Sequence, residues 1–151
     1  MKPLFVLLGS FSIAFTLIKI TGGYWNFISA GNIAMSIMLA FTAIGHFKFP
    51  KGMSMMMPDA VPFKKELVLF TGFVEIAAAI GLMLPAMRHI TSILLIIFFI
   101  CILPANINAA IKKIDYEKGT YHGMGINYLW FRVPLQVFFI LWLWYFGIYK
   151  S

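Results

Sequence analysis

The sequence predicts an all-α integral membrane protein, built as a bundle of helices that cross the bilayer. Hydrophobic residues make up 62% of the 151 residues and charged residues only 11%, a balance outside the range of soluble globular domains. The apolar residues gather in long stretches separated by short polar segments. Because lipid offers the backbone no hydrogen bonds, each stretch has to be helical, and the polar–apolar alternation of membrane strands is absent.

A spanning helix needs about 20 apolar residues, and the chain is long enough for one transmembrane domain over residues 1–151. The expected spans are residues 3–20, 27–47, 64–84, 89–111 and 126–148. The first stretch is the weakest candidate for a spanning helix. A signal peptide is the alternative there, since Lys2 precedes it, but no small-x-small cleavage pattern comes before Lys19 and a retained helix is favoured.

The third stretch carries an acidic residue at membrane depth. Glu75 lies near the middle of residues 64–84, where a carboxylate costs at least about 2.5 kcal/mol and usually faces the bundle interior. Gly72 and Ala79 share its helical face, and small residues let another helix approach. We therefore expect Glu75 to face protein, with Arg132 of the fifth stretch as its ion-pair partner.

The fourth and fifth stretches add further polar side chains to apolar helices. Pro104 predicts a kink or local unwinding, and the amides of Asn106 and Asn108 after it need hydrogen-bond partners in hydrocarbon. Arg132 and Gln136 lie four residues apart and so share one helical face. Between the second and third stretches, residues 48–59 are too irregular for a span and predict an interfacial or partly re-entrant loop.

At about 1.5 Å per helical residue, Glu75 lies roughly 17 Å, Arg132 roughly 9 Å and Asn106 about 8 Å from the start or end of its stretch, all measured from the same membrane side. His46, at the end of the second stretch, belongs to the same side. The sequence thus predicts one polar pocket in the cytoplasmic half of the bundle. Its candidate residues are Glu75, Arg132, His46, Asn106, Gln136 and Asn108.

The basic residues indicate orientation rather than nucleic-acid binding, because they lie between the apolar stretches. With five spans, eight share one side: Lys2, Lys48, Lys51, Lys64, Lys65, Lys112, Lys113 and Lys118. Only Lys19, Arg88 and Lys150 fall on the other side. Positively charged residues stay cytoplasmic, so we expect a multi-pass membrane protein with its amino terminus inside and its carboxyl terminus outside.

Little in the sequence favours an enzyme acting on its own. A single cysteine, Cys101, excludes an internal disulfide and is expected to pack as a small hydrophobe. His89 falls on the opposite side from His46, so these two cannot share a metal, and no metal site is expected. No phosphate-binding loop or nucleophile motif occurs, and the catalytic residues stay unknown.

Four short signatures occur in order along the chain. They are Thr42 to Phe47, Pro58 to Pro62, Glu75 with its alanines, and Leu103 to Ile107. Over residues 30–145 the chain thereby resembles the DoxX family of small bacterial membrane proteins. The resemblance implies a four-helix core, to which the first stretch adds an extra amino-terminal transmembrane helix, and it carries over Gly45, His46, Glu75, Pro104 and Asn106 by motif position.

DoxX members have been linked to thiosulfate and quinone oxidation and to complexes that handle oxidative stress. The resemblance therefore implies an accessory subunit of a membrane redox or stress-related complex, with quinone as the candidate cofactor of the polar pocket. Two alternatives remain open. In the first, the polar residues only join helices in a non-catalytic assembly or escort protein that docks a membrane partner through Met55 to Met57. In the second, the chain transports a small solute as a homo-oligomer.

Overall fold

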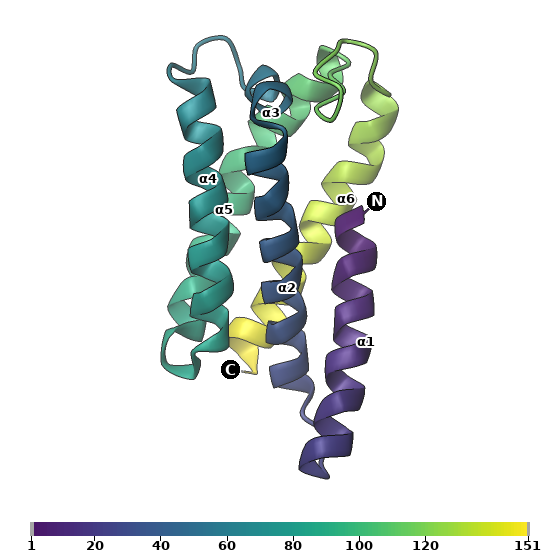
Figure 1. Ribbon diagram of the computed structural model, residues 1–151, viewed down its shortest axis with the longest axis vertical. Coiled ribbons are helices and arrows are strands. Elements are labelled where there is room, and N and C mark those ends of the chain that lie inside the picture. The colour runs from purple at the N-terminus through teal and green to yellow at the C-terminus, as the bar shows by residue number, and fades with distance from the viewer. Residues whose placement is uncertain (1, 151) are drawn as a thin grey trace.

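The computed structural model describes residues 2–150, and this part of the chain folds into helices joined by short loops (Figure 1). Five of the helices are long and apolar enough to cross a membrane. The elements are α1 (Lys2–Gly22), α2 (Phe27–Lys48), α3 (Pro50–Met56), α4 (Lys64–Met83), α5 (Pro85–Ile111), α6 (Ile126–Leu143) and the π-helical turn η1 (Trp144–Tyr149).

The apolar stretches predict these helices closely, with three differences. α5 begins at Pro85 rather than at residue 89, because proline at the first helical position gives up only an amide that would be unpaired anyway. The unwinding expected at Pro104 is absent, since α5 runs through it. Residues 48–59 are not simply a loop, because Pro50 opens the short helix α3 within them.

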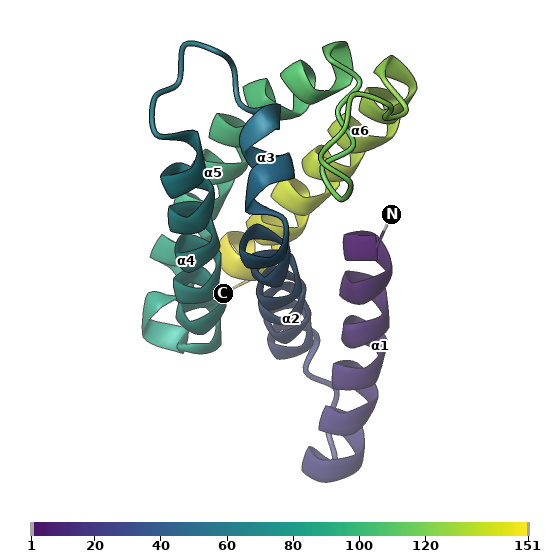
Figure 2. The ribbon, with the colours of Figure 1, turned by 45° about the horizontal axis from the view of Figure 1, so that its top comes forward.

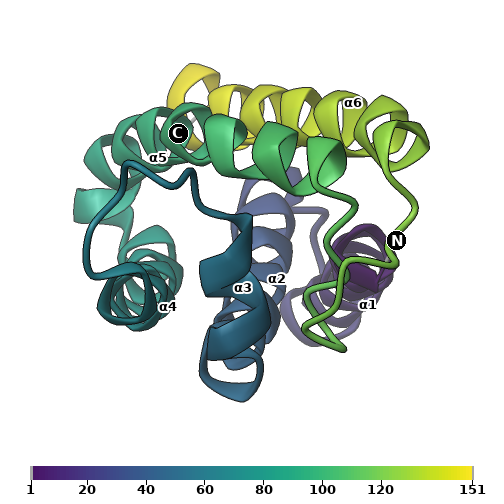
Figure 3. The ribbon, with the colours of Figure 1, turned by 90° about the horizontal axis from the view of Figure 1, so that it is seen from above.

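The core lies where α2 meets α4, α5 and α6 (Figures 1 and 3). Leu39, Leu82, Leu95 and Leu143, one from each of these helices, are at most 1% exposed. Close packing at the end of the bundle that holds the carboxyl terminus depends on Gly31, because an added Cβ would lie 2.4 Å from the ring of Phe146.

Helix α1 is attached to one side of this core. It packs along α2 and lies away from α4 (Figure 2), and only Leu7 and Ala14 among its residues are buried. Its large apolar side chains Phe5, Ile13 and Ile20 are more than 60% exposed. α1 therefore presents most of its surface outside the bundle.

Two long loops, residues 57–63 before α4 and residues 112–125 before α6, lie with α3 at the same end of the bundle (Figure 1). There Asp59 receives hydrogen bonds from Lys112 at 2.8 and 2.7 Å and from Lys64 at 3.4 Å. The hydrogen bond and charge of Lys112, followed by those of Lys64, lower the pKa of Asp59. These contacts tie the loop before α4 to the end of α5.

Candidate functional site

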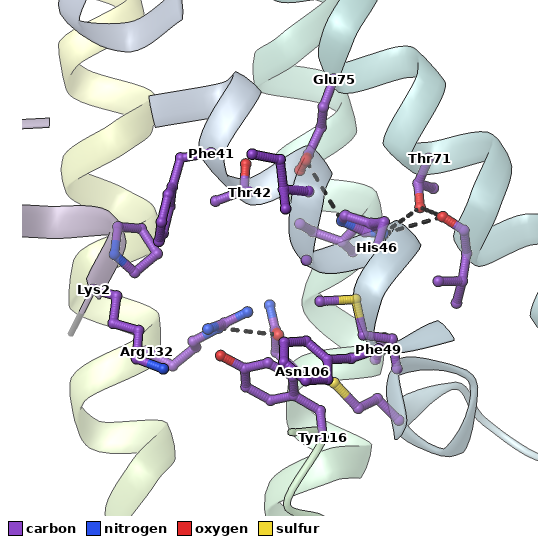
Figure 4. Close-up of a pocket in the computed structure, with 18 of the residues that line it drawn as sticks. Lys2, Phe41, Thr42, His46, Phe49, Thr71, Glu75, Asn106, Tyr116 and Arg132 are labelled. Atoms are coloured by element: carbon purple, nitrogen blue, oxygen red, sulfur yellow. Dashed lines mark hydrogen bonds and ion pairs between the residues drawn. The ribbon is translucent and has the colours of Figure 1, made fainter. Parts of the chain in front are cut away.

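A cavity of about 480 Å³ lies between the helices at the end of the bundle that holds α3 (Figure 4). Most of its wall is apolar, with aromatic and methionine side chains. It is lined in part by Met38, Phe41, Phe49, Met53, Met56, Met57, Phe99, Tyr116 and Phe139. Five of the six predicted pocket residues also line it: His46, Glu75, Asn106, Arg132 and Gln136.

Asn108 is the predicted pocket residue that the cavity does not include. Its amide donates to the backbone oxygen of Met56 at 2.8 Å. Asn108 therefore fastens α3 to α5, and its prediction as a pocket residue is corrected. Residues two apart on a helix point in different directions, which separates Asn108 from the cavity residue Asn106.

Glu75 is held on α4, with its side chain only 5% exposed. The predicted ion pair with Arg132 is wrong, because among residues 2–150 the basic side chain at the Glu75 carboxylate is His46, whose Nε2 lies 3.5 Å from Oε2. Gly72 explains the difference. An added Cβ there would lie 2.9 Å from the Cβ of His46, so this glycine lets α2 approach α4 and brings His46 to the carboxylate.

The ring of His46 is oriented by its other nitrogen. Nδ1 lies 3.1 Å from the backbone oxygen of Val68 and 3.0 Å from Oγ1 of Thr71, whereas the Thr71 hydroxyl donates to the same Val68 oxygen at 2.8 Å. Two acceptors therefore face Nδ1, so in the neutral imidazole the proton lies on this nitrogen. Nε2 is left facing the carboxylate of Glu75.

The carboxylate of Glu75 lacks hydrogen bonds. Its Oε2 is buried and has no donor among residues 2–150, because the Nε2 of His46, 3.5 Å away, makes no hydrogen bond to it. A buried polar group without a hydrogen bond typically costs about 1–3 kcal/mol, and more when it is charged. The site thus holds an acceptor that the protein itself does not satisfy.

Arg132 belongs to a different network, which joins α5 to α6. Its Nε donates to Oδ1 of Asn106 at 3.2 Å, and its Nη1 donates to the hydroxyl of Tyr128 at 2.7 Å. The Asn106 amide donates to Gln136 at 3.4 Å, and Gln136 donates to the backbone oxygen of Phe99. These bonds hold the guanidinium at the cavity wall without a carboxylate partner among the described residues.

The outer wall of the cavity is made by residues far apart in the sequence. Lys2 donates to Glu117 at 2.6 Å, which joins the start of α1 to the loop between α5 and α6. The hydrogen bond from Lys2 is the main cause of a lowered pKa at Glu117. Beside it, burial raises the pKa of Tyr116 to about 12, so this phenol keeps its proton and remains a hydrogen-bond donor at neutral pH.

The Lys2 to Glu117 contact is expected to open in acid. Because the pKa of Glu117 is lowered from 4.5, the contact is fully present above pH 4.5 and is lost as the pH falls through the lower pKa of the folded protein. Glu117→Gln should have the same effect at neutral pH. A spin label at the start of α1 should gain mobility in both cases, and unchanged mobility in acid and in the variant would contradict the contact.

The sequence did not point to several residues of the site. Tyr128 holds Arg132 without lining the cavity, and it carried a signal, because it lies four residues before Arg132 on the same helical face. Lys2 and Glu117 carried no such signal in the sequence, since 115 positions separate them.

Cys101 was expected to pack as a small hydrophobe inside the bundle. It is exposed on α5, so this expectation is wrong. Among residues 2–150, no group of three His, Cys, Asp or Glu side chains could hold a metal ion.

Fold and site together define a class: a helical protein with five helices able to cross a membrane and a largely apolar cavity bearing buried polar groups. The family model described as "Domain of unknown function (DUF8561)" matches residues 35–147, and the chain belongs to this family. The match begins inside α2 and leaves out α1. No curated protein and no solved structure matches the chain.

Proposed function

We propose that this chain is a multi-pass protein of the bacterial inner membrane, with a four-helix core of α2, α4, α5 and α6 and with α1 as an additional span. The exposed apolar side chains of these helices support contact with lipid. The eight basic residues at the end that holds α3, against three at the other end, favour an amino terminus inside and a carboxyl terminus outside.

This orientation predicts which loops a membrane-impermeant thiol reagent reaches. In a Cys101→Ser background, His89→Cys should be labelled in intact bacterial cells, because the start of α5, where His89 is exposed, lies outside. Lys113→Cys should be labelled only after the cells are opened. Labelling of the Lys113 position in intact cells, with protection of the His89 position, would reverse the orientation.

Within the membrane, the chain is proposed to bind a small amphipathic molecule, as an accessory subunit of a redox or stress-related complex. The observation that carries this proposal is the buried Glu75 oxygen without a hydrogen bond at the wall of a cavity. The volume of about 480 Å³ lies within the usual range for small-molecule sites, which are mostly apolar with a few polar groups. The redox setting rests on the likeness to DoxX.

A purely structural role for the polar residues fits the site less well. Polar residues that only join helices are expected to satisfy one another, as Arg132, Asn106 and Gln136 do. Glu75 does not take part in this network. Docking of a partner through the methionines is also less favoured, because Met56 is buried against Ala109 and Ile114.

Mass spectrometry of the purified protein tests the binding proposal. The protein isolated in mild detergent should retain a small amphipathic molecule, and Glu75→Gln should retain at least about tenfold less, since that change removes the charge at the unsatisfied acceptor. Glu66→Gln makes the same chemical change on an exposed turn of α4 and should leave retention unchanged. A folded Glu75→Gln protein with full retention would contradict the proposed site.

A further inference from the structure

The charge pattern of the cavity defines the ligand more closely, an inference that rests on the proposed binding function. We propose that the ligand is a bipolar molecule with an apolar body, carrying a primary ammonium group for His46 and Glu75 and an acid group for Arg132. Figure 4 shows these groups around one cavity, with Glu75 and His46 toward one end and Arg132 toward the other.

The end formed by His46 and Glu75 consists of hydrogen-bond acceptors. With its proton on Nδ1, held between Val68 and Thr71, His46 presents the lone pair of Nε2. Oε2 of Glu75 lies 3.5 Å from that nitrogen and has no donor. A primary ammonium has three N–H donors, so one group can satisfy the nitrogen and the carboxylate together while neutralising the buried charge.

The end formed by Arg132 consists of hydrogen-bond donors. Nε and Nη1 are bound to the neutral oxygens of Asn106 and Tyr128, which fix the guanidinium without neutralising it. A guanidinium has five N–H donors in a planar fork that matches carboxylate or phosphate. The remaining donors and the positive charge are therefore suited to an acid group of the ligand.

A ligand with only one of the two groups leaves the other end unmatched. An acid without an amine would bring a second negative charge toward Glu75, and an amine without an acid would add a positive charge to the cavity of Arg132. A neutral carbonyl compound offers no donor to the oxygen of Glu75. Between the two ends, Phe41, Phe49 and Met53 supply an apolar wall for the ligand's body.

Three probes with the same indole body test the charge pattern on the full chain in detergent: tryptophan with both groups, tryptamine with the amine alone, and indole-3-propionate with the acid alone. Binding is measured by calorimetry. Tryptophan is expected to bind at least about tenfold more tightly than either single-charge probe, because each probe lacking one group leaves the charge of Glu75 or of Arg132 unmatched.

The variants assign each charge to its end of the cavity. Glu75→Gln should remove the advantage of tryptophan over indole-3-propionate, and Arg132→Met should remove its advantage over tryptamine. Glu66 and Arg88 lie outside the cavity lining. Glu66→Gln and Arg88→Met should therefore preserve the tighter binding of tryptophan relative to both single-charge probes. Should Arg132→Met fail to fold, the comparison of probes on the unaltered chain still decides the question.

Failure of this inference is distinguishable from failure of the binding proposal. If the protein retains a neutral molecule such as a quinone, lost in Glu75→Gln, while the three probes bind equally or not at all, the bipolar ligand is overturned and the binding site stands. If no molecule is retained and no probe binds, both proposals are overturned.

Discussion

Replacing Gly52 with alanine is expected to lower the free energy of unfolding by about 1–3 kcal/mol, the usual cost of overpacking. An added Cβ would lie 1.9 Å from the backbone oxygen of Tyr116 and 2.6 Å from its carbonyl carbon. Backbone atoms cannot move aside as the end of a flexible side chain can, so α3 must separate from the loop that holds Tyr116. Unfolding in mixed detergent micelles measures the loss.

Gly9→Ala is the matched control for this change. Gly9 lies within α1 and has no atom within 4 Å of an added Cβ, so alanine should be neutral or stabilise the helix by about 0.5–1 kcal/mol. Gly9→Ala should therefore not lower the free energy of unfolding, whereas Gly52→Ala should. Equal stability of the Gly52→Ala and Gly9→Ala proteins would contradict the contact between α3 and the loop.

Replacing Asn106 with leucine is expected to destabilise the bundle by about 1–3 kcal/mol. Asn106 accepts from Arg132 Nε and donates to Gln136, so leucine leaves a guanidinium donor and an amide oxygen without these partners. The same change frees Arg132 from its position at the cavity wall. We expect lower unfolding free energy and weaker binding of an acid-bearing ligand, measured on the same preparation.

Asn108→Leu is the matched control for Asn106→Leu, because it makes the same change at another asparagine of α5. Asn108 makes its bond to the backbone oxygen of Met56 at 2.8 Å and lies outside the cavity lining. Its loss should cost about 0.5–1.5 kcal/mol, as for an ordinary hydrogen bond, and leave ligand binding intact. A larger effect from Asn108→Leu than from Asn106→Leu would argue against a central role of Asn106.

The long helices were predictable because an apolar stretch in lipid has few alternatives to a helix. The shorter elements α3 and η1 were not predictable from the sequence. The seven residues of α3, which include Pro50 and Gly52, are too few for a helical period to show. The π-helical turn η1 makes a contact that the local sequence does not reveal: the backbone oxygen of Phe146 accepts a hydrogen bond at 3.0 Å from Asn32, which lies 114 positions earlier in the chain.

The pocket residues were predictable for a related reason, since polar side chains stand out against apolar stretches. Their pairing was not. The sequence suggests that Glu75 and Arg132 attract each other, but it does not reveal that Gly72 lets His46 reach the carboxylate first. Nor does it reveal that Asn106 and Tyr128 already hold the guanidinium. These pairings depend on how closely the helices approach.

The most direct test of the binding site is an experimental structure in a lipid nanodisc, at a resolution that shows side chains around Glu75. We expect an elongated non-protein density in the cavity, with a polar end within hydrogen-bond distance of the Glu75 carboxylate. A cavity closed by direct contact between Glu75 and Arg132, with both side chains fully hydrogen-bonded and no added density, would contradict it.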